Sequence, residues 1–336
     1  MTIKDIAKES GYAVGTVSRV LNDQPGVSEK ARVRIMEVVD KYQFRLNSNA
    51  KLLKQQNNNS VAVIIKGTNN MLFAGLVEIL QGLIKDKSYT SVVYYINEDG
   101  NEVEQAMQIC RDIKPLGILF LGSNKENFRD KFEYVDVPCV LVTNSAEGLD
   151  FENLSSVCIN DEKAAKTAIE YLITLGHKKI GVLGGEMKYS TPAKARYEGC
   201  LSAFVENGID FDPDKYYESN YFTMDGGYHA MKCLLQKTTD LTAVFAMSDV
   251  TAIGAIRAIC ESGKRVPEDI SVIGFDGIEI GQYIAPRLTT IRQPDERIAE
   301  RVVDILLKQI SGEGTAIHEQ TTFTLVEGNS TCRLMY

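Results

Sequence analysis

The sequence has few of the residues on which catalytic and metal centres usually depend. Its three histidines, at positions 177, 229 and 318, stand far apart, with no metal-ligand spacing to one another or to a cysteine pair. His177 follows a helix-ending glycine, so we expect it to form a cap at the surface. The chain also lacks a phosphate-binding GK[ST] loop, a GxGxxG motif and a GxSxG motif. These absences argue against an enzyme, and we expect no catalytic residue, no metal and no cofactor.

Long hydrophobic runs are missing as well. No apolar stretch approaches the ~18 residues that are needed to cross a bilayer. The N-terminus, MTIKDIAKES, is charged at once, unlike a signal peptide. The seven cysteines are scattered and odd in number, mostly in apolar runs such as PCVLV, which is typical of buried, reduced thiols. We therefore expect a cytoplasmic protein with no disulfide framework and no membrane partner.

A net positive charge is missing everywhere except in the first 57 residues. That segment holds 10 Lys/Arg and 6 Asp/Glu, a net of +4, whereas the remainder holds 27 basic and 39 acidic residues, a net of −12. A basic head on an acidic body suggests that only the head meets a polyanion such as DNA. The alternative is a basic surface that merely faces water.

The head has the pattern of three helices. Thr2 can cap a first helix, Gly11 ends it, and a second helix is expected from about Val14 to Leu21. Residues 22–26, NDQPG, are a loop by composition, and Ser28 can cap a third helix. Two helices joined by a short glycine-containing turn and braced by a third form the helix-turn-helix plan. Val17, Val20 and Leu21 are expected in its core.

From Ser60 onward, short apolar strands alternate with amphipathic helices. The expected strands are 61–66, 91–96, 117–122, 138–143, 179–185, 242–247 and 270–276, with helices at 161–175, 193–207, 226–236, 249–262 and 294–310. This alternation favours parallel sheets covered by helices on both faces, and its length favours two α/β lobes. Ligands in such folds bind at the carboxyl ends of the strands, here between the lobes.

The whole chain resembles the lactose-repressor family of bacterial transcription regulators. The head segment TIKDIAKESGYAVGTVSRVLNDQPGVSEKARVRI carries the family pattern, with TVSRVLN as its most specific part. In the body, LGHKKIG, RYEG, MSDVTAIGAIRAI, VPEDISVIGFDG and LTTIRQP follow in the family's order. The resemblance implies a small all-α helix-turn-helix head, residues 1–46, and a hinge helix and linker, 47–60. It also implies a periplasmic-binding-protein-like body, 61–336, with an N-lobe of about 61–159 and 290–319 and a C-lobe of about 160–289 and 320–336.

In this family the second helix enters the major groove of DNA, and its first residues contact the bases. Val14 and Gly15 give a bare helix start that allows close approach, and Arg19 suits bidentate hydrogen bonding to guanine O6 and N7. Ala13 and Tyr12 depart from the usual residues before this helix and leave its N-cap weak. The expected DNA-binding residues of the head are Thr2, Val14, Gly15, Thr16, Ser18, Arg19, Asn22 and Ser28.

The resemblance also implies a hinge helix that wedges a leucine into the minor groove. By position Leu53 is that leucine, Asn47 begins the helix, and Lys51 stands where arginine is commoner. Leu46 replaces a frequent proline. The alternative is that Leu52 and Leu53 only pack the linker against the body.

A small effector between the lobes is the third implication. The positions carried over are Leu72, Phe73, Thr143 and Asn144 in the N-lobe and Arg196, Phe222, Ser248 and Asp276 in the C-lobe. Their carboxylate, guanidinium and aromatic groups suit a polyhydroxyl ligand such as a sugar. Asp249, next to Ser248, is expected to cap helix 249–262 instead of binding ligand.

We therefore expect a DNA-binding repressor controlled by a sugar-like effector. A purine effector, a phosphoprotein partner and a sugar receptor that binds no DNA remain as alternatives. No leucine heptad follows the body, so a homodimer and a near-palindromic operator are expected.

Overall fold

The computed structural model describes residues 3–21, 25–42, 59–67 and 70–334. The chain divides into two compact units, residues 1–58 and 59–336. Each unit is described by itself below.

In the first unit, the described residues form the three expected helices, α1 (Ile3–Ser10), α2 (Val14–Leu21) and α3 (Glu29–Lys41). Gly11 ends α1 at a φ of +78°, and the Ser28 hydroxyl accepts a hydrogen bond from the Ala31 N–H to cap α3. The core contains Ile6, Ala7, Val17, Val20, Ile35, Val38 and Val39, and Leu21 packs against it. The expected core positions are thus confirmed.

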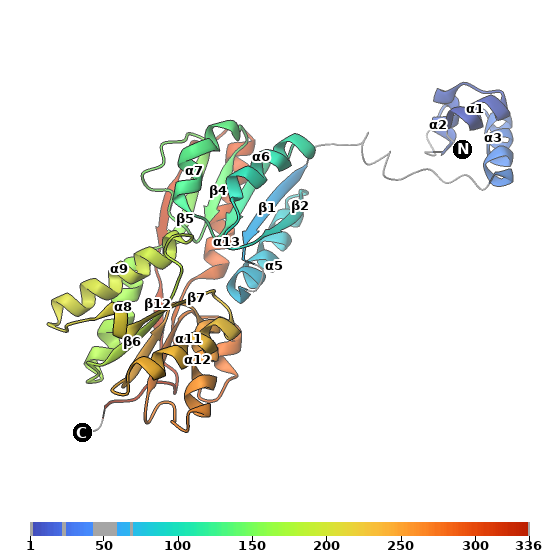
Figure 1. Cartoon of the computed structure of the whole chain (residues 1–336). Coiled ribbons are helices and arrows are strands. Elements are labelled where there is room, and N and C mark those ends of the chain that lie inside the picture. Colours follow the sequence, from blue (N-terminus) through green and yellow to red (C-terminus); the bar gives the residue numbers. More distant parts are fainter. Residues whose placement is uncertain (1–2, 22–24, 43–58, 68–69, 335–336) are drawn as a thin grey trace. The chain divides into compact units, whose positions relative to one another are not determined.

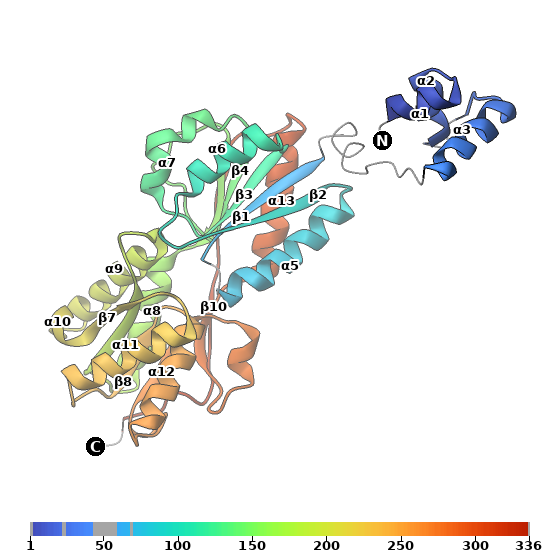
Figure 2. The same cartoon turned by 45° about the vertical axis from the view of Figure 1, so that its right-hand side comes forward.

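The described residues of the second unit form two six-stranded sheets, each between two layers of helices (Figures 1 and 2). The first sheet has the order β11-β5-β4-β3-β1-β2, and all its described pairs are parallel. Its strands are β1 (Ser60–Lys66), β2 (Thr90–Ile96), β3 (Gly117–Leu121), β4 (Cys139–Val142), β5 (Leu154–Ile159) and β11 (His318–Thr321). The helices α5 (Met71–Asp86) and α13 (Asp295–Ile310) cover one face, and α6 (Glu102–Asp112), α7 (Lys125–Lys131) and η1 (Phe132–Tyr134) cover the other.

The second sheet has the order β12-β10-β9-β8-β6-β7 and is parallel except at β12. Its strands are β6 (Ile180–Gly185), β7 (Tyr217–Asn220), β8 (Ala243–Ala246), β9 (Ser271–Asp276), β10 (Thr289–Arg292) and β12 (Thr324–Val326). The helices α8 (Asp161–Thr174) and α9 (Thr191–Glu206) pack on one face and α11 (Met224–Lys237) and α12 (Asp249–Glu261) on the other. Two short helices, α10 (Pro213–Tyr216) and η2 (Glu279–Gln282), complete this lobe.

Three segments connect the two lobes: the chain crosses after β5, after β10 and after β11. The expected return to the N-lobe at residue 290 is three residues too early, because β10 pairs in parallel with β9 up to Arg292. The N-lobe also extends to Thr321, since β11 pairs with β5 as far as that residue. Each connection leaves its sheet where a strand ends, so the two lobes face each other with the ends of their strands.

Two expectations about single residues are wrong. His177 is almost completely buried, not at the surface: its Nε2 lies 3.0 Å from the Cys332 carbonyl oxygen, and burial lowers its pKa. All seven cysteines are free, but Cys233 and Cys260 are exposed because they lie on the outer faces of α11 and α12. None of the described helices is long and apolar enough to cross a membrane.

Candidate effector site and DNA-reading helix

The exposed face of α2 is the candidate DNA-reading surface. Val14 is 42% exposed, Arg19 is exposed, and no atom lies within 4 Å of the position that a Gly15 Cβ would occupy. Thr16 and Ser18 are half-buried beside them, while Val17 and Val20 point into the core. The helix therefore separates its packing residues from a protruding face that carries a guanidinium.

Five of the expected DNA-contacting residues lie outside the part of the chain that the structure describes. These are Thr2 and Asn22 in the head, and Asn47, Lys51 and Leu53 in the hinge. Ser28 is exposed, and its hydroxyl is already engaged in capping α3.

A cavity with a volume of about 70 Å³ lies between the two lobes and brings all eight expected effector residues together. Leu72 and Phe73 begin α5, and Thr143 and Asn144 follow β4 in the first lobe. In the second lobe, Ser248 follows β8, Asp276 ends β9, and Arg196 comes from α9. Phe222 follows β7 and lies against Gly185, where a Cβ would meet the ring at 2.6 Å.

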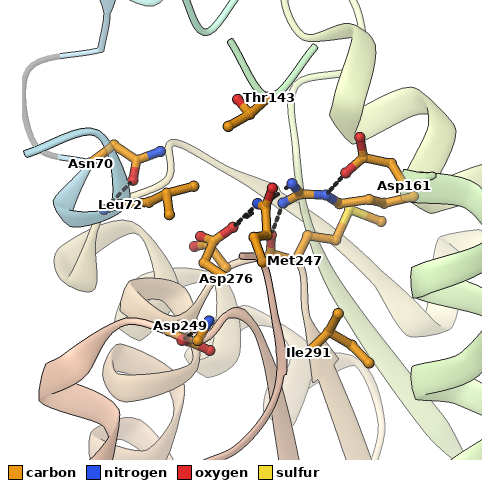
Figure 3. A network of polar contacts seen from close by, with 12 residues as sticks. Asn70, Leu72, Thr143, Asp161, Met247, Asp249, Asp276 and Ile291 are labelled. Atoms are coloured by element: carbon orange, nitrogen blue, oxygen red, sulfur yellow. Dashed lines mark hydrogen bonds and ion pairs between the residues drawn. The ribbon is translucent and has the colours of Figure 1, made fainter. Parts of the chain in front are cut away.

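Arg196 is fixed from several sides. Its Nε donates to Asp161 Oδ1 at 2.7 Å and its Nη1 to the Met247 carbonyl at 2.5 Å (Figure 3). The guanidinium stacks on the Phe275 ring at 3.7 Å, and its Nη2 lies 3.8 Å from Asp276 Oδ1. A cation held in this way keeps one edge directed at the cavity without the entropic cost of ordering the side chain on binding.

Asp276 is a buried carboxylate at the floor of the cavity. It is 5% exposed, and its Oδ1 accepts a hydrogen bond from Gln293 Nε2 at 2.9 Å. Burial raises the pKa of Asp276 to about 6, and the charge of Arg196 opposes that shift. Near neutral pH the group is an ionised acceptor facing the cavity.

The roles expected for Ser248 and Asp249 are partly reversed. Ser248 is the N-cap of α12, since its hydroxyl accepts from the Thr251 N–H at 3.3 Å, and it also lines the cavity. Asp249 does not cap the helix. Its carboxylate is fully buried and accepts from the Gly277 N–H at 2.7 Å, from the Ile278 N–H at 2.8 Å and from the Thr290 hydroxyl at 2.6 Å. It therefore holds the loop that follows Asp276.

Sequence reasoning missed other residues of the cavity. These are Lys66, Asn70, Glu98, Gly122, Ser123, Glu186, Tyr189, Ser190 and Pro192. Lys66, Ser123 and Glu186 stand at or just after the carboxyl ends of β1, β3 and β6. The rule that placed Asp276 would have found these three as well. Glu98 follows β2 by two residues and meets the same rule, whereas Tyr189 lies in a loop that no comparable signal marks.

Hydrogen bonds across the cleft join the lobes. Asn124 Nδ2 donates to the Lys188 carbonyl at 3.0 Å, and the Lys125 N–H donates to the Thr191 hydroxyl at 3.1 Å. Glu98, from the first lobe, accepts a hydrogen bond from the Phe222 backbone N–H of the second. Ile278, just after Asp276, packs against the core of the first lobe. The described cleft is therefore a closed one. Within the described residues, no group of His, Cys, Asp and Glu could hold a metal ion.

Known proteins share this architecture. The model of bacterial regulatory proteins of the lacI family matches residues 2–47, and that of a periplasmic binding protein-like domain matches residues 169–331. The chain is 35% identical to the HTH-type transcriptional regulator MalR of Clostridium butyricum, over 98% of this chain and 99% of the relative. The chain belongs to the lacI family. The HTH-type transcriptional repressor PurR of Pasteurella multocida is 31% identical over 92% of both chains.

Two solved structures of transcription regulators share the fold of this chain. The CelR–cellobiose complex aligns over 98% of this chain and 99% of the other, with a TM-score of 0.71 and 25% identity. The lac repressor dimer bound to operator and the anti-inducer ONPF aligns over 99% of both, with a TM-score of 0.73 and 24% identity. The helix-turn-helix head and the two-lobed parallel-sheet body are thus the family's, and the relatives are transcriptional regulators, not enzymes.

Proposed function

We propose that this protein is a sequence-specific DNA-binding repressor whose operator affinity is controlled by a sugar or sugar derivative bound between the lobes. The observation that carries the proposal is that one chain combines an exposed base-reading face on α2 with a closed polar cavity. The family relatives named as repressors and the cellobiose complex of a similar structure support it.

On the DNA, Arg19 makes the bidentate contact to guanine, Val14 meets a thymine methyl, and Gly15 provides clearance. Thr16, Ser18 and Asn22 contact phosphates or base edges, and Thr2 and Ser28 contact the backbone around them. The hinge residues Asn47, Lys51 and Leu53 act in the minor groove. The protein works as a homodimer on a near-palindromic site, in the cytoplasm, where the chromosome lies.

In the cavity, Asp276 and Arg196 bond paired hydroxyls of the effector from the second lobe. Asn144 and Thr143 provide polar groups from the first lobe, Ser248 adds a hydroxyl, and Phe222, Phe73 and Leu72 cover the apolar face of the ligand. Because the ligand touches both lobes, its binding shifts the equilibrium between lobe arrangements, and operator affinity shifts with it.

Selection of DNA from a random library by the purified full chain tests the proposal. We expect enrichment of a near-palindromic sequence with a guanine at the Arg19 position in each half-site. Enrichment without any sequence consensus would contradict the proposal and favour a sugar receptor that binds no specific DNA. A purine that alters operator binding where sugars do not would show that the effector class is wrong.

A further inference from the structure

The charges of the cavity are unevenly paired. Both cations that line it are already neutralised by a carboxylate outside the lining: Lys66 Nζ lies 3.1 Å from Glu102 Oε2, and Arg196 Nε lies 2.7 Å from Asp161 Oδ1. Lys66 and Glu102 are almost completely buried, and Glu102 also accepts from Asn124 N–H and Asn127 Nδ2. These cations are therefore fixed parts of the walls and offer little charge to an anionic ligand.

The negative charges of the carboxylates that line the cavity are less fully paired than the positive charges of Lys66 and Arg196. Asp276 shares Arg196 with Asp161, at the longer distance of 3.8 Å. Glu98 accepts the Phe222 backbone N–H, and Glu186 accepts the Ser219 hydroxyl at 2.6 Å. Neither hydrogen bond supplies a positive charge, although Lys66 partly offsets the rise that burial causes in the pKa of Glu98, and Glu186 stays exposed to solvent. The lining therefore presents three acidic groups, on both sides of the cleft, to whatever enters.

One buried polar atom in the lining has no partner among the described residues. Ser123 is 3% exposed, and its hydroxyl oxygen makes no hydrogen bond, although its backbone carbonyl accepts from Asn144 Nδ2 at 2.7 Å. A buried hydroxyl without a partner is costly and calls for one. Ser123 lines the cavity, so a ligand can supply that hydrogen bond.

From this arrangement we infer that the cavity selects an uncharged sugar and rejects its phosphorylated and carboxylated derivatives, with Glu98 and Ser123 as specificity-determining residues. The inference rests on the proposed function, whose effector it narrows. Sugar hydroxyls donate to Glu98 and Asp276 and pair with Ser123. A phosphate or carboxylate in the same space would be buried beside acidic groups with no free cation to compensate it.

Isothermal titration calorimetry of the full chain with matched ligands tests the inference. The neutral probes are glucose, ribose, cellobiose and maltose, and the charged probes are glucose 6-phosphate, ribose 5-phosphate and glucuronate. Adenine and hypoxanthine are included as purines. We expect the tightest ligand to be a neutral sugar and any charged counterpart to bind at least tenfold more weakly.

Two variants test the residues. Ser123→Ala and Glu98→Gln should each weaken binding of the best neutral sugar severalfold, and Glu98→Gln should narrow the difference between that sugar and its charged counterpart. Ser202→Ala and Glu268→Gln, which alter residues of the second lobe outside the cavity, are matched controls and should leave both quantities unchanged. If wild type and Glu98→Gln show the same affinity ratio between the neutral sugar and its charged counterpart, Glu98 does not determine specificity.

The outcomes separate this inference from the proposed function. If a sugar phosphate or uronate binds as tightly as its neutral parent, or more tightly, the inference is overturned but a sugar effector stands. If only a purine binds, or none of the neutral and charged sugar probes does, both the inference and the sugar effector fail. Operator binding, measured separately, remains a test of the DNA-binding function alone.

Discussion

Thr143 and Asp276 line one cavity from opposite lobes, and each holds its backbone at a positive φ, +66° and +110° (Figure 3). Each stands at the carboxyl end of a strand, Thr143 just after β4 and Asp276 at the last residue of β9. This backbone region is costly for residues other than glycine, and strain of this kind concentrates at functional sites. The side chains are thereby aimed into the cleft at the expense of local stability.

Effector affinity should depend on pH through Asp276. Its pKa of about 6 means that the carboxylate is ionised above pH 6 and becomes protonated as the pH falls through that value. A protonated carboxyl accepts fewer hydrogen bonds from ligand hydroxyls, so affinity should be constant above about pH 7 and fall towards pH 5. Calorimetric titrations at several pH values measure this. Asp276→Asn should fold, because asparagine tolerates a positive φ, and it should flatten the dependence of affinity on pH. If the pH profile of the variant equals that of the wild type, a group other than Asp276 causes the pH dependence.

Asp249→Ala should destabilise the second unit. The substitution leaves the half-buried Gly277 and Ile278 N–H groups without their acceptor, and the Thr290 hydroxyl keeps only the Ile291 carbonyl at 3.3 Å. Each unsatisfied group costs about 1–3 kcal/mol, offset in part because burial already raises the pKa of Asp249 and makes its charge unfavourable. Urea unfolding should show a loss of about 3 kcal/mol. The control Asp225→Ala, on an exposed carboxylate of α11, should lose less than about 0.5 kcal/mol.

Arg19→Ala should cost about 1–3 kcal/mol of operator binding and remove the preference at one base pair in each half-site. Non-specific binding should change little, and the salt dependence by about one unit at most. Arg34→Ala, on an exposed arginine of α3, is the control for loss of a positive charge in the head. Equal weakening on all sequences would make Arg19 a phosphate contact.

Leu53→Ala tests the hinge, which lies outside the described residues. Insertion of this leucine between base steps should bend the DNA, so the variant should bind operator more weakly and bend it less, with effector binding intact. A circular-permutation gel assay measures the bend, and Leu52→Ala serves as the neighbouring control. An unchanged bend would leave Leu53 as a linker-packing residue.

The sequence predicted those site residues best that stand at the carboxyl ends of strands. Apolar strands end at the cleft, so Asp276 and Ser248 could be placed from periodicity together with the family resemblance. Glu98 follows β2 by two residues and meets the same rule, but its hydrogen bond with the Phe222 backbone comes from the other lobe and could not be predicted. Asp249 was misassigned for a similar reason: a carboxylate at a helix start resembles a cap, and its true partners, Gly277 and Ile278, are long-range contacts. His177 was misplaced because residues near the C-terminus, including Cys332, cover it.

A titration of operator DNA shows whether a ligand in this cavity controls operator binding. Labelled operator is titrated with wild-type protein and with Asp276→Ala, each with and without a saturating sugar identified by calorimetry. We expect a 5–150-fold shift in the operator dissociation constant of the wild type, the usual range of allosteric coupling. Because alanine tolerates the positive φ of position 276 poorly, Asp276→Ala is first checked for a wild-type urea midpoint; the folded variant should bind operator normally yet show no shift at the same sugar concentration. An equal shift in both proteins, or none in the wild type, would contradict the account.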